Sequence, residues 1–108
     1  MFSLEYFEKA FDNNSKLDAF VIEIKEDFIR FENEFFIMIE EEDFTEMTRE
    51  IHKMETIVSQ LKFKELQQLF EAYKKMNIAP TEIIQLNKKL SILLHEFHVE
   101  IDKYITYV

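Results

Sequence analysis

Hydrophobic residues recur along most of the chain at alternating spacings of three and four residues, which is the period of an amphipathic helix. The longest such segment runs from Leu17 to Glu40, and charged residues occupy most of its remaining positions. Its apolar stripe consists of Leu17, Val21, Ile24, Phe28, Phe31, Phe35 and Met38, widened by Phe20 and Ile39. A helix over this range would extend about 35 Å at 1.5 Å per residue.

Four further segments show the same period. The predicted helices span Ser3 to about Phe11, Phe44 to about Leu61, Glu65 to Met76, and a last segment that begins near Pro80. Their predicted core residues are Leu4, Phe7 and Phe11; Phe44, Met47, Ile51, Met54, Val58 and Leu61; Leu66, Leu69, Phe70, Tyr73 and Met76; and Ile83, Leu86, Leu90, Leu93, Phe97, Ile101 and Tyr104. The segment Lys62-Phe63-Lys64 either bends the chain or joins the helices on its two sides. Phe35 and Phe36 cannot both face one narrow stripe, and we expect one of them to pack under the short first helix.

Several residues mark the predicted helix ends. Ser15 followed by Asp18 resembles a capping box at the start of the second helix. Asp43 is the predicted N-cap of the third helix, and Asn77 is a predicted left-handed C-cap in the absence of glycine. Pro80 suits the first turn of the last helix.

These elements predict an all-α protein, an antiparallel four-helix bundle with a short additional N-terminal helix. The 108 residues fit one domain, 1–108, and the short predicted connections favour antiparallel neighbours. The chain has no glycine and a single proline. Phosphate-binding loops and dinucleotide-binding fingerprints, which need glycine, are therefore excluded.

Charge and cysteine content narrow the possible partners. The 22 acidic and 13 basic residues give a formal net charge of −9, so we expect neither nucleic acid nor an anionic membrane as a partner. The absence of cysteine excludes disulfides and thiolate chemistry. The N-terminus lacks the features of a signal peptide, and no apolar run is long enough to span a membrane. We expect a cytoplasmic monomer.

His52 is the residue that could carry chemistry. It lies midway along the third predicted helix, about 100° away from Ile51 of the core stripe. The side chains that project near it on the helical wheel are short: Thr45, Thr48, Thr56 and Ser59. An accessible imidazole of this kind can attack a phosphoryl group carried by another protein. The alternative is an ordinary surface histidine.

The segment around His52 resembles the histidine phosphotransfer (HPt) domain family. The residues that match the family pattern are Asp43, Phe44, Ile51, His52, Met54, Leu61 and Leu66. The long preceding helix and the two following helices also fit the family's arrangement. The resemblance implies that His52 accepts a phosphoryl group from the aspartate of a response regulator receiver domain and passes it to another receiver aspartate. A hybrid histidine kinase is a second implied partner.

The same resemblance implies a phosphocarrier rather than a self-contained enzyme, with no cofactor or metal of its own and with Mg²⁺ on the receiver. The implied docking surface around His52 comprises Thr48, Arg49, Lys53, Glu55, Thr56, Ser59 and Lys62, with Ile29 and Phe36 of the second helix as further candidates.

The chain departs from the family pattern after the histidine. Glu55 stands where the family usually has Lys, and Thr56 stands where it has Gly. A carboxylate there should repel a phosphoryl group, although Arg49, Lys53 or Lys62 could restore positive charge. Lys62 stands where many members have a second Gly. These departures leave open a pseudo-HPt or helical adaptor that binds a signalling protein without phosphotransfer. A self-assembling helical module is a third possibility.

Two other clusters are interpreted as ordinary surface features. His95, His98 and Asp102 fall on one helix face but lack the spacing of a zinc motif. The acidic run from Glu40 to Asp43 is interpreted as a solvated connection between helices.

Overall fold

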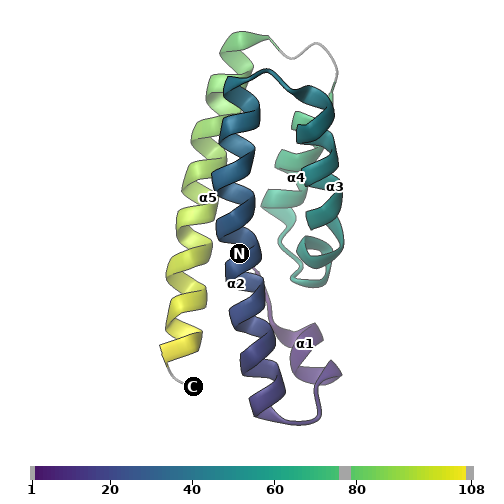
Figure 1. Ribbon diagram of the computed structural model, residues 1–108. Helices are drawn as coiled ribbons and strands as arrows, with labels where there is room; N and C mark the ends of the chain where they lie inside the picture. Colours follow the sequence, from purple (N-terminus) through teal and green to yellow (C-terminus); the bar gives the residue numbers. More distant parts are fainter. Residues whose placement is uncertain (1, 76–78, 107–108) are drawn as a thin grey trace.

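The computed structural model describes residues 2–75 and 79–106, and within these ranges the chain is helical with no strand. Figure 1 shows the order of the elements, which are α1 (Glu5–Ala10), α2 (Asn14–Glu40), α3 (Phe44–Gln60), α4 (Lys64–Tyr73) and α5 (Pro80–Thr106). The prediction of an all-α protein is confirmed.

Helices α2 to α5 run in alternating directions along an elongated molecule of 46 × 21 × 20 Å (Figure 1). Helix α2 packs against α3 and α5, and α4 packs against the same two helices. Helix α1 lies beside the first part of α2, where Phe7 and Phe11 contact Phe20 with ring centroids 5.0 and 5.1 Å apart. The prediction that Phe35 or Phe36 covers α1 was therefore wrong, because these residues lie near the other end of α2.

Phenylalanines from different helices form much of the core. Phe28 of α2 stacks on Phe97 of α5 with ring centroids 4.0 Å apart, and Phe31 meets Phe70 of α4 at 5.5 Å. Phe35 meets Tyr73 edge to face at 5.1 Å. Such aromatic pairs add about 0.5–1.5 kcal/mol each beyond the area that they bury. The six residues of the α2 stripe from Leu17 to Phe35 are all buried.

Several core predictions need correction, and the predicted core residues Leu4, Phe11, Ile83, Leu86 and Tyr104 are only partly buried. Phe44 is 51 % exposed, because it is the first residue of α3 and lies at the end of the packed helices. Met38, near the end of α2, is only partly buried. In α5 the buried stripe passes through Leu94, which was not predicted, whereas Leu93 is only partly covered. The choice between these adjacent leucines depends on how α5 is rotated against α2 and α4. Phe63, in the predicted joint, is also completely buried.

The start of α2 differs from the prediction. The Asn13 side chain accepts a hydrogen bond from the Lys16 N–H at 2.9 Å, so Asn13 is the N-cap and Ser15 lies inside the helix. An asparagine two residues earlier competes well for this position because Asn, Asp and Ser are similarly good N-caps. Asp43 caps α3 as predicted, accepting from the Glu46 N–H at 3.3 Å. Pro80 is the first residue of α5, also as predicted. Met76 and Asn77 lie outside the described residues.

Helix α2 ends in a left-handed turn built without glycine. Glu42 has a φ of 56°, its N–H donates to the Ile39 carbonyl, and the Asp43 N–H donates to the Met38 carbonyl. This pair of hydrogen bonds defines a Schellman motif. Asp43 then serves as the N-cap of α3, so one short turn ends one helix and begins the next.

Helix α3 ends in the same way. Lys62 has a φ of 54°, its N–H donates to the Ser59 carbonyl, and the Phe63 N–H donates to the Val58 carbonyl. The chain therefore bends at the segment that the sequence left open, and α4 starts at Lys64. The left-handed backbone at Lys62 is the conformation that glycine adopts without strain.

Candidate functional site

The His52 side chain projects from the middle of α3 and is 86 % exposed. The short side chains predicted around it, Thr45, Thr48, Thr56 and Ser59, are exposed as well. Thr48 is held to the helix because its hydroxyl donates to the Phe44 carbonyl at 3.0 Å. The imidazole is therefore accessible to an incoming protein, and no large neighbour covers it.

His52 lies on the flank of α3 that faces α4. Ile51 points into the core and Glu50, on the opposite flank, is 6 % exposed. Glu55 and Ser59, which share the His52 side of the helix, line a groove together with residues of α4. Because α2 packs on the other side of α3, the α2 candidates Ile29 and Phe36 are not brought to the histidine by any described contact.

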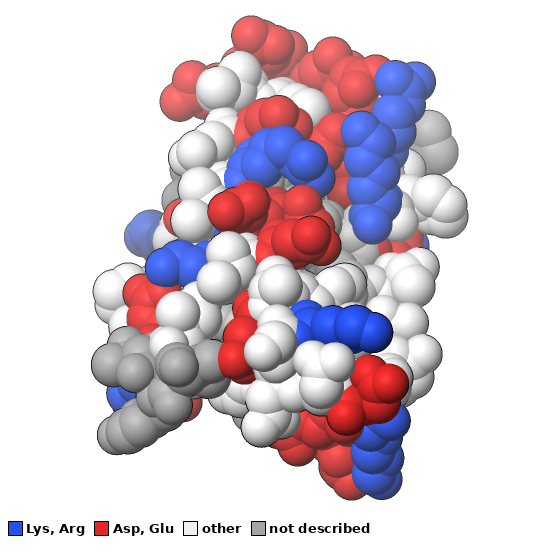
Figure 2. Space-filling view, turned by 60° about the horizontal axis from the view of Figure 1, so that its bottom comes forward, with Lys and Arg blue, Asp and Glu red and all other residues white. Residues whose placement is uncertain are grey.

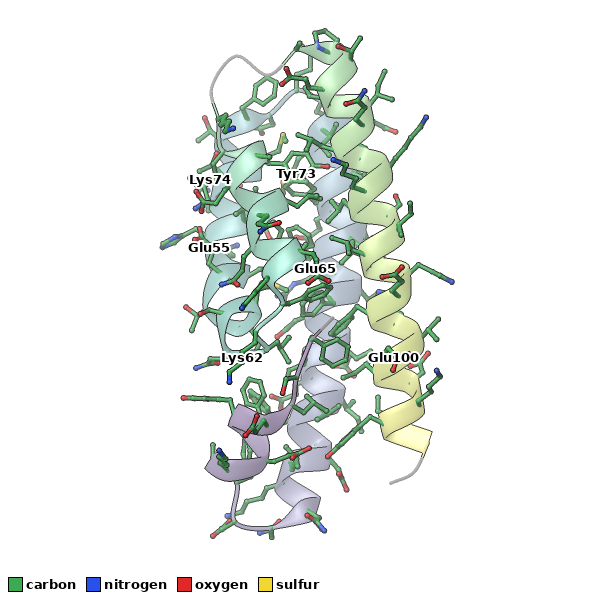
Figure 3. All side chains as sticks on the ribbon, turned by 180° about the vertical axis from the view of Figure 1, so that it is seen from behind. Glu55, Lys62, Glu65, Tyr73, Lys74 and Glu100 are labelled. Carbon is green, nitrogen blue, oxygen red and sulfur yellow. The ribbon has the colours of Figure 1, made fainter. Side chains whose placement is uncertain are left out.

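A chain of polar contacts connects His52 to α4. The Nδ1 atom of His52 lies 3.6 Å from Oε1 of Glu55, and the same oxygen lies 2.8 Å from Nζ of Lys74. Nζ of Lys74 is also 3.0 Å from Oε1 of Glu71. Figure 3 shows Glu55 and Lys74 side by side at the outer edge of the α3 and α4 pair. Hydrogen bonds to Glu55 and Glu71 raise the pKa of Lys74 because both carboxylates favour its charged form.

The Glu55 carboxylate is therefore not the unopposed negative charge that the sequence suggested. Lys74, at the C-terminal end of α4, pairs with it and shares its charge with Glu71. The cations proposed from the sequence have other partners: Arg49 pairs with Glu46 at 2.6 Å, and Lys53 pairs with Glu50 at 2.9 Å.

Lys62, the third proposed cation, lies at the turn after α3. Its charge contributes to lowering the pKa of Glu5, after the larger effect of a hydrogen bond from Lys9. It therefore belongs to the end of the molecule near α1, as Figure 3 also shows.

A groove of about 470 Å³ lies between α3 and α4 next to Glu55. The residues lining it are Glu55, Ser59, Gln67, Gln68, Phe70 and Glu71. The wall of the groove is about equally polar and apolar, so amide, hydroxyl and carboxylate groups stand beside exposed carbon atoms. Of the docking residues proposed from the sequence, Glu55 and Ser59 line this groove. Arg49, Lys53 and Thr56 are exposed on the outer face of α3.

Two residues of the cluster formed by His95, His98 and Asp102 contact side chains of α2 instead of each other. Nε2 of His98 lies 3.3 Å from Oε2 of Glu32, and Lys25 pairs with Asp102. Over residues 2–75 and 79–106, no three His, Cys, Asp or Glu side chains form a group able to hold a metal ion. Within the same ranges no helix is both long enough and apolar enough to cross a membrane.

Lys74, Glu71 and the two glutamines are the site residues that sequence reasoning missed. All four belong to a segment predicted to be helical, but their approach to the Glu55 side of α3 depends on the bend at Lys62. The sequence left that bend open. Comparison with known proteins adds no further assignment, because the chain matches no family model, no curated protein and no solved structure.

Proposed function

We propose that this chain is an HPt-like antiparallel four-helix bundle that carries a phosphoryl group on His52. Support comes from the alternating directions of α2 to α5 and from the position of His52 midway along α3. The observation that carries the proposal is the exposure of the imidazole, at 86 %, among short side chains. A histidine that exchanges phosphoryl groups with another protein needs this accessibility.

The proposed reaction is an in-line transfer between two proteins. The Nε2 lone pair of His52 attacks the phosphorus of a receiver phosphoaspartate, the N–P bond forms, and the O–P bond breaks with its electron pair left on the aspartate carboxylate. The reverse step delivers the group to a second receiver aspartate. Catalysis of this kind consists of positioning and of neutralising phosphoryl charge. The receiver would supply its Mg²⁺ and lysine.

The partner surface in this proposal is the exposed surface of α3 around His52, from its outer face to the flank that faces α4. Thr48, Glu55, Thr56 and Ser59 would meet the partner close to the histidine, and the groove beside Glu55 would receive one of its loops. Lys74 supports the proposal because it offsets the carboxylate of Glu55 where a dianionic phosphoryl group would approach.

The test is phosphoryl transfer from a phosphorylated receiver domain, with the wild type beside His52→Gln. We expect an acid-labile label on the wild type and none on the variant. The exposed position of His52 makes the substitution harmless to folding, which circular dichroism checks. A label that persists in His52→Gln would contradict the assignment of the acceptor.

The second candidate function is an adaptor that binds a receiver or kinase without transfer. The observation that favours it is the pair Glu55 and Thr56, where the HPt family usually has Lys and Gly. Saturable receiver binding in both proteins, with no label in either, would support the adaptor over the phosphocarrier.

A further inference from the structure

Glu55 lies one helical turn after His52 and points to a specific atom of its ring. The carboxylate oxygen is 3.6 Å from Nδ1, just beyond hydrogen-bond range, and a small rotation of the exposed imidazole would close the gap. Among the described residues, no hydrogen bond or ion pair involves the other ring nitrogen, Nε2. The two nitrogens of the exposed imidazole therefore have different environments: one faces a carboxylate, and the other faces solvent.

The position of the Glu55 carboxylate is fixed from a second helix. Its Oε1 atom lies 2.8 Å from Nζ of Lys74, and Glu71 holds the same ammonium from the α4 side at 3.0 Å. The Glu55 side chain is only 35 % exposed, in contrast to the histidine that it faces. A carboxylate restrained in this way loses little additional freedom when it accepts a hydrogen bond.

We propose that Glu55 is a positioning residue that accepts a hydrogen bond from Nδ1–H of His52 and leaves the Nε2 lone pair free to attack phosphorus. This inference rests on the proposed phosphotransfer function and adds the residue that keeps the reacting nitrogen free of its proton. Which nitrogen of a histidine reacts is set by the hydrogen bond that the other nitrogen makes. Glu55 would thus assist the transfer at the very position where its charge first suggests repulsion.

The charge balance of the step favours the same arrangement. Attack by Nε2 forms the N–P bond and breaks the O–P bond of the aspartyl phosphate, while the proton stays on Nδ1. The ring becomes an N-phosphoimidazolium cation, and its positive charge is shared by the Nδ1–H group that faces Glu55. Lys74 remains paired with the carboxylate throughout, so no proton has to enter or leave the site.

The first test is the tautomer of His52, read from two-bond ¹H–¹⁵N correlation spectra at about pH 8, above the ordinary histidine pKa of about 6.5. The chain has three histidines, and the His52 signals are those lost in His52→Gln. We expect the proton on Nδ1 in the wild type. In Glu55→Ala we expect it on Nε2, which is the tautomer favoured by a free imidazole side chain.

Glu100→Ala is the matched control, because it removes an equal charge and the partner of Lys103 on α5, away from His52 and Glu55 (Figure 3). We expect this variant to keep the proton on Nδ1. A wild-type proton on Nε2, a Glu55→Ala spectrum identical to wild type, or the same change in both variants would overturn the proposal.

The second test uses phosphoramidate as a small phosphoryl donor, so that no receiver is needed. The ³¹P spectrum distinguishes the two phosphohistidine isomers. We expect the wild type to form the Nε2 isomer, and Glu55→Ala to react about fivefold more slowly, as the loss of one exposed charge-assisted hydrogen bond implies. An Nδ1 isomer in the wild type, or an unchanged rate in Glu55→Ala, would overturn the proposal.

The two tests separate this inference from the function on which it rests. A wild-type chain with its proton on Nδ1 that accepts nothing from any receiver would contradict phosphotransfer alone. A chain that accepts the group from a receiver with its proton on Nε2 would contradict the role of Glu55 alone.

Discussion

At the scale of single residues, neighbours one turn away determine what a side chain can do. His52 is accessible because the positions around it carry threonine and serine, and its charge environment comes from Glu55 and Lys74. In the core, neighbouring side chains are large and cover a residue instead of leaving it exposed. Phe97 is completely buried, and its ring packs against Phe28 and two other aromatic rings.

Truncation of Phe97 should test this packing. We expect Phe97→Ala to lower the free energy of unfolding by about 3–5 kcal/mol, because the substitution removes apolar contacts and leaves a cavity. Urea unfolding followed by circular dichroism measures the change. Phe44→Ala is the control, since Phe44 is half exposed, and its cost should stay below about 1 kcal/mol. Equal costs for the two variants would contradict the assigned core.

We expect the free energy of unfolding to fall at alkaline pH because of the buried Tyr73. Burial raises its pKa because the phenolate would lose hydration, and its hydroxyl donates to Oδ1 of Asn87 at 2.8 Å. In the unfolded chain the phenol ionises near pH 10. Its contribution to stability is therefore fully present below pH 10 and is lost as the pH rises toward the higher folded value.

The measurement is urea unfolding of the wild type and Tyr73→Phe between pH 8 and pH 11, the range that brackets an ordinary tyrosine pKa of about 10. We expect the variant to lose less stability than the wild type over this range. Tyr6→Phe, at a half-exposed site, is the matched control and should follow the wild type. A parallel decline in all three proteins would show that Tyr73 is not responsible.

At the scale of elements, the turns between the helices have a geometry as well defined as that of the helices. Helices α2 and α3 both end in a Schellman motif whose left-handed residue, Glu42 or Lys62, is not glycine. The residue that follows, Asp43 or Phe63, is the N-cap of the next helix. These turns set the register between α3 and α4 and so bring Lys74 to Glu55.

Lys62→Gly should stabilise the protein. A residue with a Cβ in left-handed backbone costs roughly 1–2 kcal/mol, partly offset by the greater freedom of glycine in the unfolded chain, so we expect a gain of about 0.5–1 kcal/mol. Thermal and urea unfolding measure it. Lys88→Gly in the exposed middle of α5 should do the opposite, with a loss of about 1 kcal/mol. A loss in both variants would contradict the strain assigned to Lys62.

At the scale of the whole molecule, acidic residues outnumber basic ones, but the two kinds lie next to each other on the surface (Figure 2). The net charge is −9, yet the face in Figure 2 shows basic side chains between acidic ones, and many of them form pairs one helical turn apart. Exposed pairs of this kind contribute little, about 0–1 kcal/mol each. The excess of carboxylates leaves a net self-repulsion in the folded state.

Salt should therefore stabilise the fold. We expect the midpoint of thermal unfolding to rise between about 10 mM and 0.15 M NaCl, over which the Debye length falls from about 30 to 8 Å. Screening weakens repulsion across the molecule more than it weakens close pairs. Scanning calorimetry at constant pH measures the shift, and a midpoint that falls with salt would show that the surface ion pairs dominate instead.

The sequence by itself determined the helical class, most of the buried stripes, the Asp43 cap, the helix start at Pro80 and the exposed strip around His52. These follow from periodicity and from local capping, which act over a few residues. Tertiary structure alone decided which of Leu93 and Leu94 is buried, why Phe44 is not, and that Lys74 pairs with Glu55. Each of these depends on how one helix is rotated and shifted against another, and that is fixed by packing among residues far apart in the chain.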